Sequence, residues 1–261
     1  MLFSFVLIDL TTSATPDAMR PASVLQSIAD AASEQVNKTF AAVFGGASAA
    51  FRVGSGPTDR ATNEIAINFR DTLDVQGALA YHQVVGGVPD IEEGVDLFQT
   101  LTSGAESLSV GVTHEVLETL RDAGCNGWKD KQDGSGLTGA EECCDPVQNT
   151  CYPASNGVDV TNFVLPSYWT PGASAPFDQL GVMTSTTDLS NGYEIQAQAP
   201  TNETQAGPGE KAEAPEGKSE PELARVVHGK PFLKGAENLS ELARKRKASK
   251  HSRTSRRGIT I

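Results

Sequence analysis

Three residues in the segment Thr113–Asp122 have the types and the spacing of a metal site. On a helix, His114 and Glu118 lie four residues apart on one face, so both can point at one ion, and Glu115 lies beside them within reach of a bound water. The spacing is that of H-E-x-x-H, in which two histidines hold zinc and the glutamate is the general base, with Glu118 replacing the second histidine. A carboxylate can bind zinc, but it moves a site toward calcium, magnesium or manganese. The alternative is an ordinary amphipathic helix with solvated glutamates and an incidental histidine.

The elements that must position this segment follow from the spacing of apolar residues. The apolar opening 1–10 predicts a buried strand, apolar residues at helical spacing predict a largely helical segment over 16–43, and an amphipathic helix is expected from Ser107 to Gly124. Alternating residues and turn signals predict further strands at 49–53, 64–69, 78–82, 94–98 and 158–165. This order of elements predicts a mixed α/β (α+β) domain.

The region between Gly124 and Ser155 is rich in Gly, Asp and Asn and contains all four cysteines of the chain, within 27 residues. Their spacing does not match the paired C-x-x-C of zinc ribbons. Two disulfides could staple these loops, one joining Cys125 to Cys143 or Cys144 and the other joining the remaining cysteine of that pair to Cys151. The alternative is that the four are reduced thiols.

Charge divides the chain into two parts. The whole chain of 261 residues has a net charge of −12, but residues 1–195 carry 25 acidic against 8 basic residues, and residues 196–261 carry 8 against 13. An acidic body argues against a nucleic-acid-binding core, because phosphate binding needs clustered Lys and Arg. The folded domain is therefore expected to span 1–195.

The C-terminal part has the composition of a disordered tail. Residues 196–235 are dominated by Pro, Glu, Ala and Gly and predict a linker, and residues 236–261 predict a basic tail with a short helix over 236–250. This tail has the charge to bind nucleic acid, an anionic surface or an acidic partner, and its simpler reading is a solubilising end.

Neither a membrane span nor a signal peptide is expected from the sequence. The most apolar stretch, Leu2–Ile8, is far shorter than the roughly 20 residues that a spanning helix needs, and no basic residue precedes it. The localisation is therefore left open, with the cytoplasm as one expectation.

Several segments, in order along 1–195, resemble an uncharacterised family of zincin-like proteins from bacteria and their phages. Val110–Glu118 is similar to the family's S-H-E-x-x-E helix, with Thr113 in place of Ser and Asp122-Ala123 in place of a following Asp-Pro. Further similar segments are 77–82 (G-A-L-G-Y-H), 142–147 (E-x-x-D-P-V), 161–169 (S-N-F-V-x-P-x-W-F) and 192–193 (the end of G-G-Y). More distantly, 126–128 and 142–145 resemble the G-N-x-W and E-I-x-D segments of the plant Exordium proteins.

The resemblance implies a zincin-like fold, with a twisted mixed sheet and the H-E-x-x-E helix beside its edge strand. His114 and Glu118 would hold a metal, zinc first with calcium or manganese as alternatives. Among the acids that compete for the place of third ligand, Asp145 is favoured over Glu142. Asp122, eight residues beyond His114, is expected to orient a ligand.

Two functional hypotheses follow from this resemblance. The first is a metal-dependent hydrolase acting on a peptide or protein, with Glu115 as general base and His82 or Tyr81 stabilising the oxyanion. The second is a non-catalytic virion or accessory protein that keeps the zincin scaffold and contacts phage structural proteins. A simpler alternative for His82 is a packed or surface histidine.

Overall fold

The computed structural model describes residues 2–12, 22–46, 48–75, 78–130, 137–189, 191–198, 202–206 and 232–233. The helices are α1 (Ala22–Glu34), a π-helical segment (Gln35–Phe40), α2 (Ala41–Phe44) and α3 (Leu108–Arg121), with 3-10 turns at Val95–Leu97, Asp145–Val147 and Pro166–Trp169. The strands are β1 (Leu2–Asp9), β2 (Ser48–Val53), β3 (Ile65–Arg70), β4 (Ala78–Val85), β5 (Val88–Gly94), β6 (Trp128–Asp130), β7 (Leu137–Ala140), β8 (Cys151–Pro153), β9 (Asp159–Thr161), β10 (Glu194–Gln198), β11 (Asn202–Ala206) and β12 (Phe232–Leu233). The mixed α/β class is confirmed.

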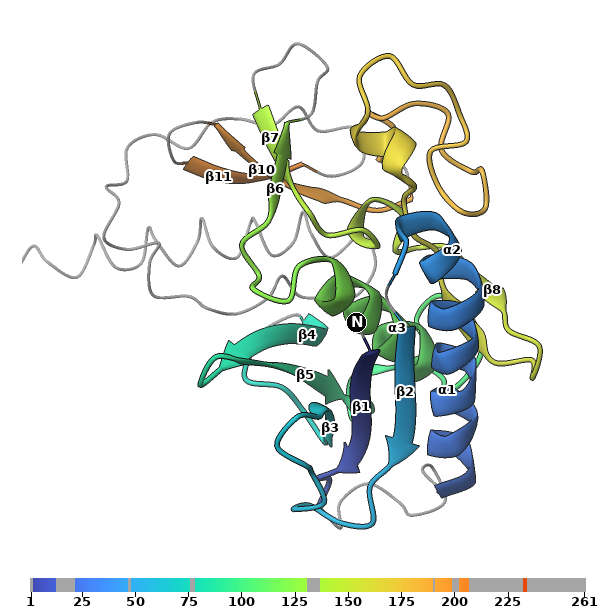
Figure 1. Cartoon of the computed structure of the whole chain (residues 1–261), viewed down its shortest axis with the longest axis vertical. Coiled ribbons are helices and arrows are strands. Elements are labelled where there is room, and N and C mark those ends of the chain that lie inside the picture. Colours follow the sequence, from blue (N-terminus) through green and yellow to red (C-terminus); the bar gives the residue numbers. More distant parts are fainter. Residues whose placement is uncertain are drawn as a thin grey trace, which may run out of the picture.

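The main sheet has the strand order β12-β4-β5-β3-β1-β2, and Figure 1 shows its strands β1 to β5. Strand β1 runs parallel to β2 and β3, and β3 runs parallel to β5. Strand β4 is antiparallel to β5, and β12 pairs antiparallel with β4. A two-residue turn joins β4 to β5, with Gly86 and Gly87 at φ 59° and 85°, and such positive angles favour glycine in tight hairpins.

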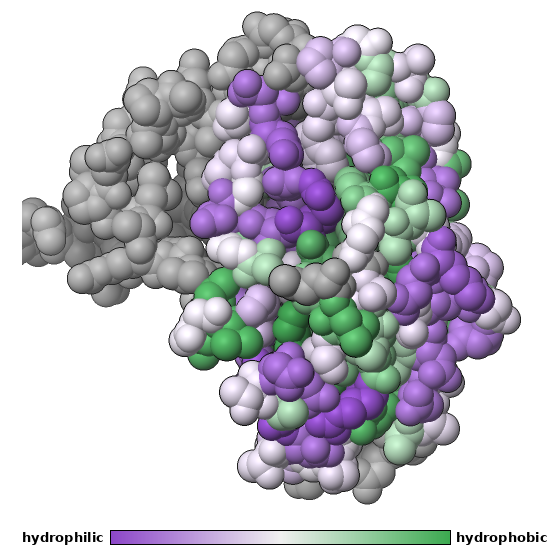
Figure 2. Space-filling view, in the orientation of Figure 1, coloured by the Kyte–Doolittle hydropathy of each residue, from purple (hydrophilic) through white to green (hydrophobic). Residues whose placement is uncertain are grey.

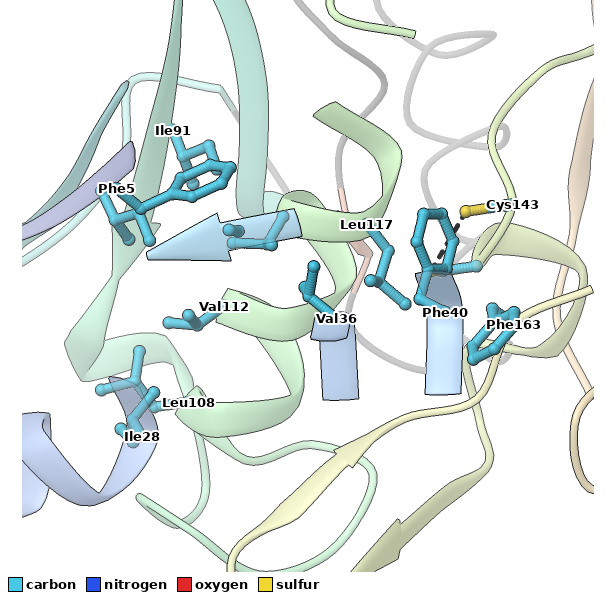
Figure 3. Close-up of a cluster of buried hydrophobic side chains, with 14 of the residues drawn as sticks. Phe5, Ile28, Val36, Phe40, Ile91, Leu108, Val112, Leu117, Cys143 and Phe163 are labelled. Carbon is cyan, nitrogen blue, oxygen red and sulfur yellow. Dashed lines mark hydrogen bonds between the residues drawn. The ribbon is translucent and has the colours of Figure 1, made fainter. Parts of the chain in front are cut away.

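The hydrophobic core lies between one face of this sheet and helices α1 and α3. Alternation along each strand directs every second side chain to this face. Figure 3 shows Phe5 beside Ile91 on the sheet, and Ile28 of α1 beside Leu108 of α3. Because both helices pack on the same face, α3 is held against strands β4 and β5.

The opposite face of the sheet is partly polar, and its buried acids are paired. Asp90 accepts a hydrogen bond from Arg60 at 3.0 Å, and Glu92 pairs with Arg70. Tyr81 lies opposite Glu92 in the β4–β5 pairing and therefore belongs to this face, away from α3. Its hydroxyl donates to Asp74 at 2.8 Å.

A second sheet, of order β11-β10-β7-β6, and the β8–β9 hairpin are built from the loop-rich part of the chain. Strand β10 pairs with β7 and crosses residue 195, so regular structure continues past the predicted end of the domain. Apart from the end of β10 and strands β11 and β12, the predicted linker 196–235 and basic tail 236–261, with its short helix, lie outside the described residues.

Two predicted strands differ from the structure. The segment 94–98 is mostly a 3-10 turn, because the tight turn at Gly86-Gly87 lets β5 begin at Val88 and end at Gly94. The predicted strand 158–165 is reduced to β9, Asp159–Thr161. The first difference matters for the site, because it places Glu93 inside a strand.

The surface mixes hydrophobic and hydrophilic residues. On the face shown in Figure 2, hydrophobic residues gather in the middle, between hydrophilic areas. The large hydrophobic side chains exposed among the described residues are Leu2, Val85, Leu180 and Val182. Within the same residues, every helix is too short or too polar to cross a membrane.

Helix α3 is buried along most of its length, from Leu108 to Thr119. The Ser107 side chain caps its start by accepting a hydrogen bond from the Val110 amide. Gly111 allows the close approach of the neighbouring chain, because a Cβ there would lie 2.5 Å from the Phe98 ring and 2.9 Å from Glu93 Oε2. The absence of a side chain at Gly111 thus sets how closely β5 and the following turn pack against the helix.

We expect Gly111→Ala to lower the free energy of unfolding by about 1–2 kcal/mol, because overpacking outweighs the higher helix propensity of alanine. Urea denaturation measures the change. Gly56→Ala is the matched control, since a Cβ at Gly56 meets no atom within 4 Å. A Gly111→Ala variant as stable as the wild type would contradict the close packing.

Candidate metal centre

Helix α3 supplies the centre of the candidate site. Its 3.6-residue period puts His114 and Glu118 on one side, one turn apart. His114 Nε2 lies 3.2 Å from Glu118 Oε1. Both side chains have 0% exposure, as does Glu115 between them. The predicted i, i+4 pair is therefore formed inside the protein.

The loop after β7 folds back onto this helix. Its residue Asp145 starts a 3-10 turn with Pro146 in the first turn, and Asp145 Oδ1 lies 3.3 Å from His114 Nε2. The backbone amide of Cys144 donates to Glu118 Oε1 at 3.1 Å. These two contacts bring the downstream acid to the same histidine nitrogen that faces Glu118.

Gly192 and Tyr193 hold Asp145 in place. The Tyr193 amide donates to the Asp145 carbonyl at 3.0 Å, and burial together with the charge of Asp145 raises the pKa of Tyr193 well above its ordinary value. A Cβ at Gly192 would lie only 2.0 Å from the Asp145 carbonyl oxygen, so this approach requires glycine. The paired Gly-Tyr therefore positions a candidate ligand.

Strand β4 brings a second histidine to the cluster. His82 pairs with Ile91 in the β4–β5 register, which puts its side chain on the face that packs against α3. His82 Nδ1 lies 2.9 Å from Glu115 Oε2 and 3.9 Å from Glu118 Oε2. Its other nitrogen, Nε2, lies 3.8 Å from Glu142 Oε2. The His82 ring is thus surrounded by three carboxylates.

Glu93 is a further buried acid near the cluster. It pairs with Ala80 in the same register and lies against Gly111 of α3. Within the described part of the chain, neither of its carboxyl oxygens has a hydrogen-bond partner. Burial, together with the charge of Glu115, raises the pKa of Glu93 well above its ordinary value, which favours the neutral carboxylic acid.

The spacing of the donor atoms fits a metal ion. Ligand atoms bound tetrahedrally to one zinc at about 2.0–2.1 Å lie about 3.3 Å apart. The distances from His114 Nε2 to Glu118 and Asp145 are 3.2 Å and 3.3 Å. Cys144 offers another donor, because its ligand atom and those of His114 and Glu118 all lie within 4.8 Å of one another. The residues present can therefore hold a divalent ion.

The negative charge of the buried carboxylates also favours the binding of a cation. Four carboxylates surround the two histidines, and the exposure of all six side chains is at most 2%. Among the described residues no buried Lys or Arg is present to balance them. Buried carboxylates are costly unless they are paired, protonated or bound to a metal.

The pKa values show how protons can substitute for that cation. Burial alone would lower the pKa of His114, but Glu118 and Asp145 raise it well above its ordinary value. Burial raises the pKa of Asp145 to about 6, although the contacts with His114 oppose this. Burial also raises the pKa of Glu118. Without a metal, the cluster therefore retains protons on its ligands.

Six of the predicted site residues meet in one cluster: His82, His114, Glu115, Glu118, Glu142 and Asp145. Asp122 lies elsewhere, because it ends α3, and its carboxylate accepts a hydrogen bond from the Gly127 amide at 2.6 Å. Its position shapes the following turn and does not orient a ligand. Tyr81 lies on the other face of the sheet, so it cannot share the predicted role of His82.

The suggested disulfides are not present, and all four cysteines have free thiols. The Cys143 and Cys144 sulfurs are 3.8 Å apart, well beyond the bond length of about 2.05 Å. Cys125 Sγ faces the His82 carbonyl, and Cys151 packs near Leu79, Ala80 and Val110. Cys143 and Cys144 are thus neighbours, whereas Cys125 and Cys151 lie in other surroundings.

Sequence reasoning missed Glu93, the proximity of the Cys144 thiol to the metal ligands, and the role of Tyr193. The alternation of β5 could have placed Glu93 on the face of Ile91, had the strand been assigned to 88–94. Cys144 directly precedes Asp145, so its proximity follows once Asp145 is accepted as a ligand. Compared with protein-family models, with curated proteins and with solved structures, the chain matches none of them.

We expect zinc affinity to fall as the pH is lowered through about 6, because protons compete for Asp145 and His114. Above this range Asp145 is ionised and can bind the ion. Below it, each displaced proton weakens binding about tenfold per pH unit. Competition with a chromophoric chelator between about pH 5 and pH 7.5 measures the effect. An affinity that does not change over this range would contradict the assignment of these ligands.

Proposed function

We propose that this chain is a metal-dependent hydrolase of the zincin type that cleaves peptide bonds with zinc. The observation that carries the proposal is the convergence of Glu118 and Asp145 on His114 Nε2, at 3.2 Å and 3.3 Å, with Glu115 on the same helix. The sequence resemblance to zincin-like proteins supports it. The proposal extends to the substrate, a peptide or protein, because zincins act on peptide bonds.

Glu115 is the general base in this proposal. An ion held by His114, Glu118 and Asp145 would supply Lewis acidity and lower the pKa of a water molecule. Glu115 would accept a proton from the attacking water and return it to the leaving amine. His82, at 2.9 Å from Glu115, fixes the orientation of that carboxylate.

We expect the protein purified without added metal to contain at least one divalent ion per chain, and the ion at His114 to be lost in His114→Ala and Glu118→Ala. Elemental analysis measures this. Glu115→Gln should keep the ion at His114 but lower peptidase activity about 10²–10⁴-fold, because it removes the base.

Asp30→Asn is the matched control for these variants. Asp30 is an exposed carboxylate on α1, away from the cluster, so its removal should change neither metal content nor activity. Protein that binds no ion after dialysis against zinc, calcium and manganese would refute the proposal.

One observation favours a second candidate, a non-catalytic protein with a fold-stabilising metal centre. All the candidate ligands are buried, with at most 2% exposure, and Cys144 offers a fourth protein donor beside His114 and Glu118. Four protein ligands are typical of structural zinc sites, whereas catalytic sites keep one position open. In this case the scaffold would serve a virion or accessory role.

Cobalt substitution separates the two candidates. If Cys144 is a ligand, the cobalt protein should show a thiolate-to-metal charge-transfer band in the near ultraviolet, and Cys144→Ala should abolish it. The adjacent Cys143→Ala is the control and should keep the band. The catalytic proposal predicts instead that the band is absent and that Cys144→Ala retains its ion.

A further inference from the structure

We propose that Glu118 bridges two divalent cations, so that the cluster is a dinuclear centre. The inference rests on the proposed function, since it keeps the ion at His114 and adds a second one. Glu118 Oε1 faces His114 Nε2 at 3.2 Å, whereas Glu118 Oε2 faces His82 Nδ1 at 3.9 Å. The two oxygens of one carboxylate therefore point to two different histidines.

The second set of ligands is His82, Glu115 and Glu118. Their donor atoms all lie within 4.8 Å of one another, as do those of the first set, and Glu118 is common to both. The shortest contact in the second set is the 2.9 Å between His82 Nδ1 and Glu115 Oε2. Glu118 is thus placed between two potential ions.

Glu142 has a supporting role in this arrangement. An ion bound at His82 Nδ1 leaves Nε2 to carry the ring proton, and Glu142 Oε2 lies 3.8 Å from that nitrogen. A carboxylate that faces the other nitrogen of a metal-bound histidine fixes the tautomer and the orientation of the ring. The Glu142 carboxylate is thus at ion-pair distance, and beyond hydrogen-bond distance, of the His82 nitrogen that an ion would leave protonated.

The surroundings of Glu118 Oε2 are a separate observation in favour of a second cation. The Glu118 side chain has 0% exposure, and within the described residues this oxygen has no hydrogen-bond donor. A buried carboxylate oxygen without a donor is costly. A cation between Glu118 and His82 would satisfy it.

The balance of charge favours two ions over one. Glu115, Glu118, Glu142 and Asp145 bring four negative charges into the interior, and no buried Lys or Arg accompanies them among the residues described. One divalent ion with two neutral histidines leaves two of these charges uncompensated. Two divalent ions neutralise all four, and carboxylate-bridged pairs of ions lie about 3.5–4 Å apart in two-metal hydrolases.

The inference changes the role of one residue. With both ions bound, Glu115 is a ligand of the second ion; with one ion bound, it keeps its contact with His82 and acts as a base. The two descriptions therefore differ in what Glu115→Gln does to the metal content, independently of any activity.

The test is the number of ions per chain, measured by native mass spectrometry and elemental analysis of the full chain titrated with Mn²⁺ alone. We expect two ions in the wild type and in Asp30→Asn, and one in His82→Ala and in Glu115→Gln. Electron paramagnetic resonance should show an exchange-coupled manganese pair in the wild type and an isolated ion in both variants.

Saturation of the wild type at one ion, retained in His82→Ala and Glu115→Gln, would overturn the dinuclear centre and leave the proposed function intact. Binding of no Mn²⁺ would overturn the dinuclear centre, whereas the proposed function falls only if zinc and calcium do not bind either. The wild-type stoichiometry decides the question even if one variant fails to fold, which circular dichroism would reveal.

Discussion

Burying a cluster of carboxylates and histidines is the constraint on which the rest of this structure depends. A helix that is buried on all sides is usually hydrophobic all round, yet α3 carries His114, Glu115 and Glu118 within its buried segment Leu108–Thr119. These side chains avoid the cost of desolvation only if they are paired with one another, protonated or bound to a cation. Strand β4 and the loop before Asp145 bring the remaining polar side chains to the same place, so the fold and the cluster require each other.

Two glycines, Gly111 and Gly192, show how closely neighbouring segments of the chain pack around the cluster. A side chain at Gly111 would meet Glu93 and Phe98, and one at Gly192 would overlap the backbone at Asp145. At both positions the missing Cβ lets polar groups from distant parts of the sequence come together. The geometry of the site therefore depends on these two glycines as well as on the candidate ligands.

The local part of the site could be predicted from the helical period, whereas the long-range contacts of Asp145, Glu142 and His82 were expected only from the resemblance. The helical period fixes the i, i+4 relation of His114 and Glu118 in any α-helix, so the sequence predicted this pair without a tertiary structure. For His82, the alternation of a strand shows which neighbours share its face, but only the packing of α3 decides which face becomes the site. Glu93 was missed for a related reason, because the predicted strand began six residues after β5 does. The sequence left the cysteines open between disulfides and reduced thiols, because clustering in sequence does not decide whether two sulfurs come into bonding geometry.

The depth of the cluster also links metal binding to folding. Ligands that come from β4, α3 and the turn at Asp145 converge only in the folded chain, so an ion that binds them adds its binding free energy to the stability of the fold. This holds for a catalytic centre and for a structural one, and stability alone therefore cannot distinguish them. What differs is the number of protein donors around the ion. Two groups determine this number. The Cys144 thiol would be the fourth protein ligand of a single ion, and the second carboxyl oxygen of Glu118 would bind a second ion.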